Sequence, residues 1–177
     1  MRTFVAIEIP QEIRVKIHAL GGKIPGRLSR MAIDNIHITL LFLGDINSEQ
    51  LAKVQRAIAT INVKPFSIAI KGISYFGGRE MHTIFANVTD DGQTKAVYLE
   101  LSELLLSFGI KAEHSREYIP HVTIARVKEG NADTREFIGR NSGQEFGEFN
   151  VSAICIKQSV LSEKGPVYTT LFERKLA

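Results

Sequence analysis

The residues best suited to chemistry in this sequence form two copies of a His-x-Thr pattern, each inside an apolar run. His37 and Thr39 make the first copy, and His121 and Thr123 make the second. Because successive side chains of a strand point to opposite faces, each histidine shares a face with its threonine, and apolar neighbours occupy the other face. Two such strands facing each other would bring two imidazoles and two hydroxyls into one cleft. Such a set can move two protons and hold a phosphate without a metal ion.

Paired histidines suit the hydrolysis of a cyclic phosphodiester. Histidine, with an unperturbed pKa of about 6.5, can give or take a proton near neutral pH. For a 2′,3′-cyclic phosphate, one imidazole would deprotonate the attacking water while the other protonates the departing ribose oxygen. The threonine hydroxyls would hold the nonbridging oxygens. A single His-x-Thr on a strand is common by chance, but two copies in corresponding places favour a shared cleft.

Other kinds of catalytic site find less support in the sequence. A zinc site is disfavoured because neither motif has a histidine at i+4, an accompanying glutamate or a cysteine cluster. The single cysteine, Cys155, lies in an apolar run and is expected to be buried, and no Gly-x-Ser-x-Gly is present. His18, His82 and His114 have no paired pattern and are expected to be surface or structural residues. We expect no metal and no cofactor.

Two further candidates for substrate binding follow the motif histidines by five residues. Arg126 could bind a phosphate bidentately. An odd offset places it on the face opposite His121 in a regular strand, so it joins the site only if the strand bends, bulges or ends there. Phe42, in the equivalent place after His37, could stack on an unpaired base. A core aromatic is the more ordinary interpretation of Phe42.

The elements that position these residues are a mixture of strands and amphipathic helices. Strands are expected near residues 3–9, 35–43, 66–76, 81–88, 121–127, 148–161 and 167–175. A first helix is expected from Ile13 to a stop at Gly21-Gly22, and a second is expected to begin after a cap formed by Asn47 with Gln50. A third is expected over residues 97–108, and a fourth is expected to begin at a capping box of Asp133 with Glu136.

The arrangement of these elements predicts the fold class. The two motifs lie close to half the chain apart, and each motif strand is followed by a capped helix and then a strand pair. This repeat predicts two related lobes across a pseudo-twofold groove. Because hairpins are mixed with separate helices, we expect an α+β fold of antiparallel-rich sheet with helices packed outside. Residues 1–177 are expected to form one domain of two lobes.

Bulk composition sets limits on location and partners. Lys plus Arg outnumber Asp plus Glu by 22 to 19, a net charge of +3 that is compatible with an anionic partner without demanding one. No segment reads as a targeting signal, and no apolar run approaches the roughly 20 residues of a membrane span. A lone cysteine excludes a disulfide framework. The expected location is the cytoplasm, with no membrane association and no obligate protein partner.

Several stretches of this sequence resemble a known family. They cover residues 2–7 with Pro10, residues 35–44, residues 120–126, and Ser159, Gly165, Tyr168 and Leu171. The chain resembles the two-histidine phosphoesterase superfamily, and within it the RNA 2′,3′-cyclic phosphodiesterases historically called 2′-5′ RNA ligases. One departure is that many relatives carry a tryptophan in the strand equivalent to residues 81–88, where this chain has Ile84-Phe85 and no tryptophan.

The resemblance implies an activity and residue roles. It implies metal-free cleavage of RNA ends carrying a 2′,3′-cyclic phosphate, with transfer RNA fragments among the candidates, to leave a 2′-phosphate. His37 would be the proton donor and His121 the proton acceptor, with Thr39 and Thr123 on the phosphate and Arg126 assisting. The reverse reaction would form a 2′-5′ linkage. A noncatalytic RNA or nucleotide binding module, and the same chemistry on a small cyclic nucleotide, remain the alternatives.

Overall fold

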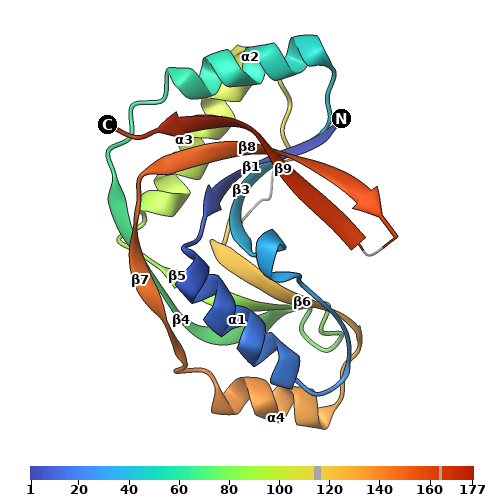
Figure 1. The fold of residues 1–177 in the computed structure, drawn as a ribbon. Coiled ribbons are helices and arrows are strands. Elements are labelled where there is room, and N and C mark those ends of the chain that lie inside the picture. Colours follow the sequence, from blue (N-terminus) through green and yellow to red (C-terminus); the bar gives the residue numbers. More distant parts are fainter. Residues whose placement is uncertain (114–116, 164) are drawn as a thin grey trace.

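The computed structural model describes residues 1–113, 117–163 and 165–177 (Figure 1). Its strands are β1 (Arg2–Glu8), β2 (Arg27–Arg30), β3 (His37–Asp45), β4 (Phe66–Phe76), β5 (Thr83–Thr89), β6 (His121–Glu129), β7 (Glu145–Val151), β8 (Ala153–Ser162) and β9 (Gly165–Lys175). Its helices are α1 (Gln11–Lys23), the short 3₁₀ helix η1 (Ile33–Asn35), α2 (Ser48–Ala59), α3 (Gln93–Ser107) and α4 (Ala132–Arg140). None of the helices in this described part of the chain is both long and apolar enough to cross a membrane.

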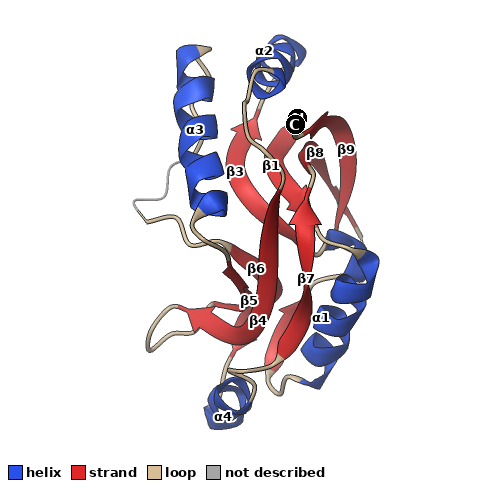
Figure 2. Ribbon diagram, turned by 90° about the vertical axis from the view of Figure 1, so that its left-hand side faces the viewer, coloured by secondary structure: helices blue, strands red, loops and turns tan. Residues whose placement is uncertain are grey.

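The strands form one strongly curled antiparallel sheet made of two lobes. Their order is β7-β4-β5-β6-β3-β1-β8-β9, and β2 pairs with β6 beside this path. One lobe contains β3, β1, β8 and β9 with α2 and α3, and the other contains β6, β5, β4 and β7 with α1 and α4. In Figure 1, α2 and α3 lie in the upper part of the molecule and α4 lies at the bottom, whereas α1 runs along the lower lobe; Figure 2 shows the curl of the sheet from the side. The expected α+β, two-lobed antiparallel fold is confirmed.

Each lobe is assembled from both halves of the chain. The β4–β5 pair follows β3 in sequence but joins β6, and the β8–β9 pair follows β6 but joins β1. The single strand expected at residues 148–161 is therefore wrong. It is two strands separated at Ser152, of which β7 pairs with β4 and β8 pairs with β1. An alternating apolar pattern does not reveal that a strand changes partner, because both partners require the same alternation.

The two motif strands meet at the centre of the sheet. β3 and β6 pair antiparallel, with Ile38 opposite Val122. These are the central residues of the two motifs, and both side chains are fully buried. An antiparallel pair has local twofold symmetry, so this register places the two His-x-Thr sets side by side around that axis.

The helix α1 continues through the glycine pair that was expected to end it. It ends at Lys23, and Ile24 is the residue after its last turn. A Cβ atom on Gly21 would lie 2.9 Å from Cγ2 of the buried Ile124 in β6. The glycine therefore serves close packing of the helix against the second motif strand, and the expected stop is wrong.

Alanine substitutions at the two adjacent glycines are expected to have opposite effects on stability. Gly22→Ala should raise the free energy of unfolding by about 1 kcal/mol, because nothing lies within 4 Å of the added methyl and alanine is the better helix former. Gly21→Ala gains the same propensity but must displace Ile124, so we expect a net loss of about 1 kcal/mol. Urea unfolding of both variants measures the difference, and equal stability would show that α1 does not pack tightly on β6.

The helix α2 begins as the sequence predicts, whereas α4 begins two residues earlier than expected. Asn47 and Gln50 form the expected capping box. The capping box of α4 is formed by Asn131 with Thr134, and not by Asp133 with Glu136. Thr134 is buried, and its hydroxyl donates to the Pro25 carbonyl at 2.8 Å, so this cap also ties the loop before β2 to the helix.

Candidate active site

Both motif strands contain a β-bulge three residues after the histidine. The extra residue is Leu40 on β3 and Ile124 on β6, because the residues on either side of each oppose consecutive residues of the neighbouring strand, β1 or β5. Exposure follows the same succession over residues 37–42 and 121–126: half-buried, buried, half-buried, buried, buried and exposed. The bulge therefore shifts the alternation of both strands by one residue.

The bulges bring Arg126 and Phe42 to the face that carries the motif histidines. An offset of five residues would place them on the opposite face in a regular strand, and one extra residue restores them. Phe42 is 45% exposed, so its interpretation as a core aromatic is wrong. We call this side of the sheet the motif face, defined by the side chains of His37, Thr39, Phe42, His121, Thr123 and Arg126.

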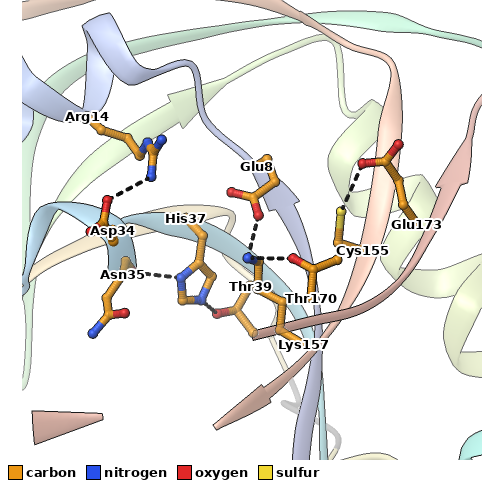
Figure 3. A network of polar contacts seen from close by, with 10 residues as sticks. All are labelled: Glu8, Arg14, Asp34, Asn35, His37, Thr39, Cys155, Lys157, Thr170 and Glu173. Carbon is orange, nitrogen blue, oxygen red and sulfur yellow. Dashed lines mark hydrogen bonds and ion pairs between the residues drawn. The ribbon is translucent and has the colours of Figure 1, made fainter. Parts of the chain in front are cut away.

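The hydrogen bonds of His37 fix the tautomer of its neutral imidazole. Nδ1 lies 2.7 Å from the carbonyl oxygen of Asn35, and because a carbonyl can only accept, Nδ1 carries the proton (Figure 3). Nε2 lies 2.9 Å from Thr39 Oγ1 and accepts from that hydroxyl. Asn35 is itself anchored, since its side-chain amide donates to the Pro166 carbonyl at 2.6 Å.

His121 is held in the corresponding way. Its Nδ1 lies 2.8 Å from the carbonyl oxygen of Ile119, which stands two residues before it, as Asn35 stands before His37. In both neutral imidazoles Nδ1 is therefore the protonated nitrogen and Nε2 the basic one. Two Nε2 atoms that can each accept or release a proton satisfy the first requirement for paired acid and base catalysis.

Aromatic rings pack against His37. The ring of Phe4 stacks on the imidazole with centroids 4.9 Å apart and planes 28° apart. Tyr168 approaches edge-on at 5.4 Å. Phe4 and Tyr168 both belong to stretches that carry the family resemblance, but neither was predicted as a site residue from spacing. The family resemblance includes both residues and so could have pointed to them. Only the structure shows that their rings reach His37.

The imidazole of His121 also lies against two aromatic rings. Phe76 is 5.0 Å away and Phe85 is 5.3 Å away between ring centroids. Phe85 occupies the strand in which the resemblance leads to the expectation of a tryptophan. In this chain the strand supplies a phenylalanine ring that lies against a motif histidine.

Burial and nearby charges lower the pKa values of both motif histidines. The pKa of His37 is lowered to about 4, chiefly because burial disfavours the imidazolium. The hydrogen bond to Asn35 opposes this shift, Lys157 adds to it, and Glu8 opposes it. The pKa of His121 is also lowered, again chiefly by burial. Both imidazoles are therefore neutral near pH 7 in the free protein.

Stability is expected to fall as the pH is lowered from about 6.5 to about 4. In this range the unfolded chain binds a proton at His37 with an ordinary pKa of about 6.5, whereas the folded protein does not. Urea unfolding across this range measures the slope. A His37→Asn variant, whose amide can still donate to Asn35, should give a shallower slope. An identical slope in the variant would contradict the lowered pKa of His37.

Arg126 adds a positive charge to the motif face. Its Nη1 donates to the buried Thr83 hydroxyl at 2.9 Å, and within the described residues it makes no ion pair closer than 4.0 Å. The charge of Arg126 lowers the pKa of His121 and opposes the raised pKa of Tyr168, so it acts on both lobes of the site. An arginine that has no carboxylate partner among the described residues and acts on the neutral imidazole of His121 is suited to bind an anion.

The segment before β6 holds β3 in place, which the sequence did not reveal. The Tyr118 hydroxyl donates to the Thr39 carbonyl at 2.9 Å, and its ring stacks on Tyr98 at 4.1 Å. The backbone N–H of Glu113 donates to the Phe42 carbonyl at 2.8 Å. Burial raises the pKa of Tyr118, so its hydroxyl remains a donor. No motif marks these contacts, because Tyr118 and Glu113 each bond to a residue more than 70 positions away in the sequence.

Among the described residues, the other two histidines and the cysteine take no part in the motif pair. His18 is exposed on α1, and Nδ1 of His82 lies 3.0 Å from the Thr83 hydroxyl. His114 lies outside the described residues. Cys155 is buried, and burial raises its pKa to about 11, so the thiol is poorly suited to be a nucleophile. In the part of the chain that is described, no three His, Cys, Asp or Glu side chains cluster to hold a metal ion.

Comparisons of the sequence with known proteins agree on one family. The sequence profile of the 2′-5′ RNA ligase superfamily matches residues 26–160. An RNA 2′,3′-cyclic phosphodiesterase of Archaeoglobus fulgidus is 30% identical, over 97% of this chain and 98% of that protein. A protein of the same name from Aquifex aeolicus is 34% identical, over 78% of this chain and 77% of its own. The crystal structure of E. coli LigT complexed with 3′-AMP has a similar fold, with a TM-score of 0.84 and 21% identity over 99% of this chain and 97% of LigT.

Proposed function

The chain belongs to the 2′-5′ RNA ligase superfamily, and we propose that it is an enzyme that hydrolyses RNA 2′,3′-cyclic phosphate ends to 2′-phosphates. The observation that carries this function is the central β3–β6 pair, which sets two His-x-Thr motifs side by side on one face of the sheet. Both imidazoles keep Nε2 as the reactive nitrogen. Two relatives that match 97% and 98% of this chain are named RNA 2′,3′-cyclic phosphodiesterase.

The reaction needs one imidazole to take a proton and the other to give one. In the proposed division, His121 takes a proton from water as the water oxygen bonds to phosphorus. His37 protonates the 3′ oxygen as its bond to phosphorus breaks. His37 must therefore enter the reaction as imidazolium, and an anionic phosphate bound beside it raises its pKa toward that form. The product carries a 2′-phosphate and a free 3′ hydroxyl.

The proposed phosphate ligands change their hydrogen bonds with this protonation. In the free protein the Thr39 hydroxyl donates to Nε2 of His37. Once Nε2 carries a proton, that hydroxyl is free to donate to a nonbridging oxygen, and the Thr123 hydroxyl would donate to another nonbridging oxygen beside His121. Arg126 would pair with the phosphate, and the exposed ring of Phe42 would stack on a base.

The proposed mechanism needs no metal or cofactor, and the proposed location is the cytoplasm. The imidazoles supply both proton transfers, so we propose a mechanism without metal or cofactor. A 5′ hydroxyl in place of water would give 2′-5′ ligation by the reverse path. We place the enzyme in the cytoplasm, acting on RNA ends such as transfer RNA fragments. A single buried cysteine is consistent with a reducing compartment.

The test uses an oligoribonucleotide that ends in a 2′,3′-cyclic phosphate, with a chelator present throughout. We expect conversion to a terminal 2′-monophosphate, identified by mass and by its mobility against defined 2′- and 3′-phosphate standards. Binding without any product would favour a noncatalytic RNA-binding module. Turnover that the chelator abolishes would overturn the metal-free mechanism. Running 2′,3′-cyclic AMP in parallel shows whether a mononucleotide is hydrolysed as well as the oligomer.

A further inference from the structure

A buried lysine lies on the motif face without an assigned role. The side chain of Lys157, on β8, is only 8% exposed. Its ammonium forms an ion pair with the Glu8 carboxylate and donates to the Thr170 hydroxyl at 3.2 Å (Figure 3). Lysine is rarely buried in proteins unless it is paired, because removing an ammonium from water costs several kcal/mol. The sheet therefore holds a charge at a defined place.

Strand register places this ion pair beside His37. Glu8 is opposite His37 in the β1–β3 pair, and Lys157 is opposite Phe4 in the β1–β8 pair. Directly opposed residues of antiparallel strands share a face, and the Phe4 ring stacks on His37. Glu8 and Lys157 therefore share the side of the sheet on which His37 lies, one strand and two strands away from it.

Every neighbouring strand contributes a titratable or charged group near His37. Glu8 comes from β1, Lys157 from β8, Tyr168 from β9 and His121 from β6. Lys157 and His121 lower the pKa of His37, and Glu8 raises it. Arg126 acts on His121 and on Tyr168. Of these groups, Lys157 is a cation that lowers the pKa of His37 and whose position is fixed by contacts with Glu8 and Thr170.

We propose that Lys157 is a positioning residue: its charge, held by Glu8 and Thr170 on the face of the sheet that carries His37, adds to burial in keeping the His37 imidazole neutral in the free protein. The consequence for catalysis rests on the proposed function. An imidazole kept neutral beside a cation takes up its proton together with an anionic phosphate, which offsets that charge. His37 then gains the proton that it transfers to the leaving oxygen only when substrate is bound.

The test measures the titration of His37 by NMR in the free protein and in charge-removing variants. Lys157→Met should raise the pKa of His37, because it removes a cation and leaves Glu8 as an unpaired anion. Glu8→Gln should lower the pKa further, because Lys157 then acts without its counterion. We expect each shift to be on the order of half a pH unit or more. Lys157→Arg should return the pKa of His37 close to its original value.

Opposite shifts distinguish an electrostatic role from a structural one. Loosened packing would change the burial of His37 in the same sense in both variants, so shifts in one direction, or no shift in either, would overturn the proposal. Lys71→Met is the matched control, because Lys71 pairs with Glu145 at 3.0 Å on the exposed surface of the other lobe. It should leave His37 unchanged. Glu8 is 43% exposed, so Glu8→Gln remains informative even if Lys157→Met folds poorly.

The same variants separate this inference from the proposed function. If the chain hydrolyses cyclic phosphates, one limb of its kcat/KM profile against pH should move in the direction that the NMR titration shows for each variant. If no hydrolysis is found, the NMR shifts still decide whether Lys157 controls His37. Hydrolysis with an unmoved profile and unmoved NMR titration would remove the role of Lys157 and leave the proposed function standing.

Discussion

Replacing either motif histidine by alanine is expected to lower kcat/KM for a 2′,3′-cyclic phosphate at least about 10²-fold. His37 and His121 each present Nε2 as the reactive nitrogen, and Nδ1 of each is held by a backbone carbonyl. Removing one imidazole leaves one of the two proton transfers without a partner. Initial rates on the defined oligoribonucleotide, with chelator present, measure the loss.

Two controls make the histidine result specific. His18→Ala removes an exposed histidine of α1 and should leave the rate unchanged. The fold-loss of kcat/KM in the double variant at His37 and His121 should be smaller than the product of the fold-losses in the two single variants, because the pair acts as a unit. A single alanine variant within a few-fold of the unchanged protein would show that its histidine transfers no proton in the reaction.

Local regularities of the sequence predicted the motif strands well. The alternation around His37 and His121 places each histidine with its threonine, and the buried pair Ile38 and Val122 confirms the apolar side. The cap at Asn47 was predictable because capping depends on residues only three apart. Structural features that depend on a few neighbouring residues could therefore be predicted from the sequence.

Features that depend on distant partners could not be predicted from the sequence. The bulge at Ile124 is defined by its pairing with β5, and the apolar pair Ile124-Ala125 is equally compatible with a bulged strand and with a strand buried on both faces. Gly21 resembles a helix stop, and only its contact with Ile124 shows that it serves packing. Lys157 reads as an ordinary strand residue until Glu8 and Thr170 are seen to surround it.

Arg126→Ala is expected to lower kcat/KM about 10²-fold, the typical loss when one preorganised donor to a developing anionic charge is removed. The guanidinium has no carboxylate partner among the described residues and is held toward the motif face by Thr83. Arg126→Lys keeps the charge but loses the bidentate geometry, so its kcat/KM should lie between those of the unchanged protein and of Arg126→Ala. Arg56→Ala, on the exposed side of α2, changes net charge equally and should have no effect.

The arginine result also tests the bulge that positions it. In a regular strand Arg126 would point to the opposite face, and its removal would then affect stability more than turnover. We therefore expect Arg126→Ala to change kcat/KM strongly while the urea midpoint moves little. A large loss of stability with unchanged turnover per folded molecule would mean that the side chain supports β5 through Thr83 and does not bind phosphate. A selective loss of turnover would show that one extra residue in β6 is what gives the second motif its phosphate ligand.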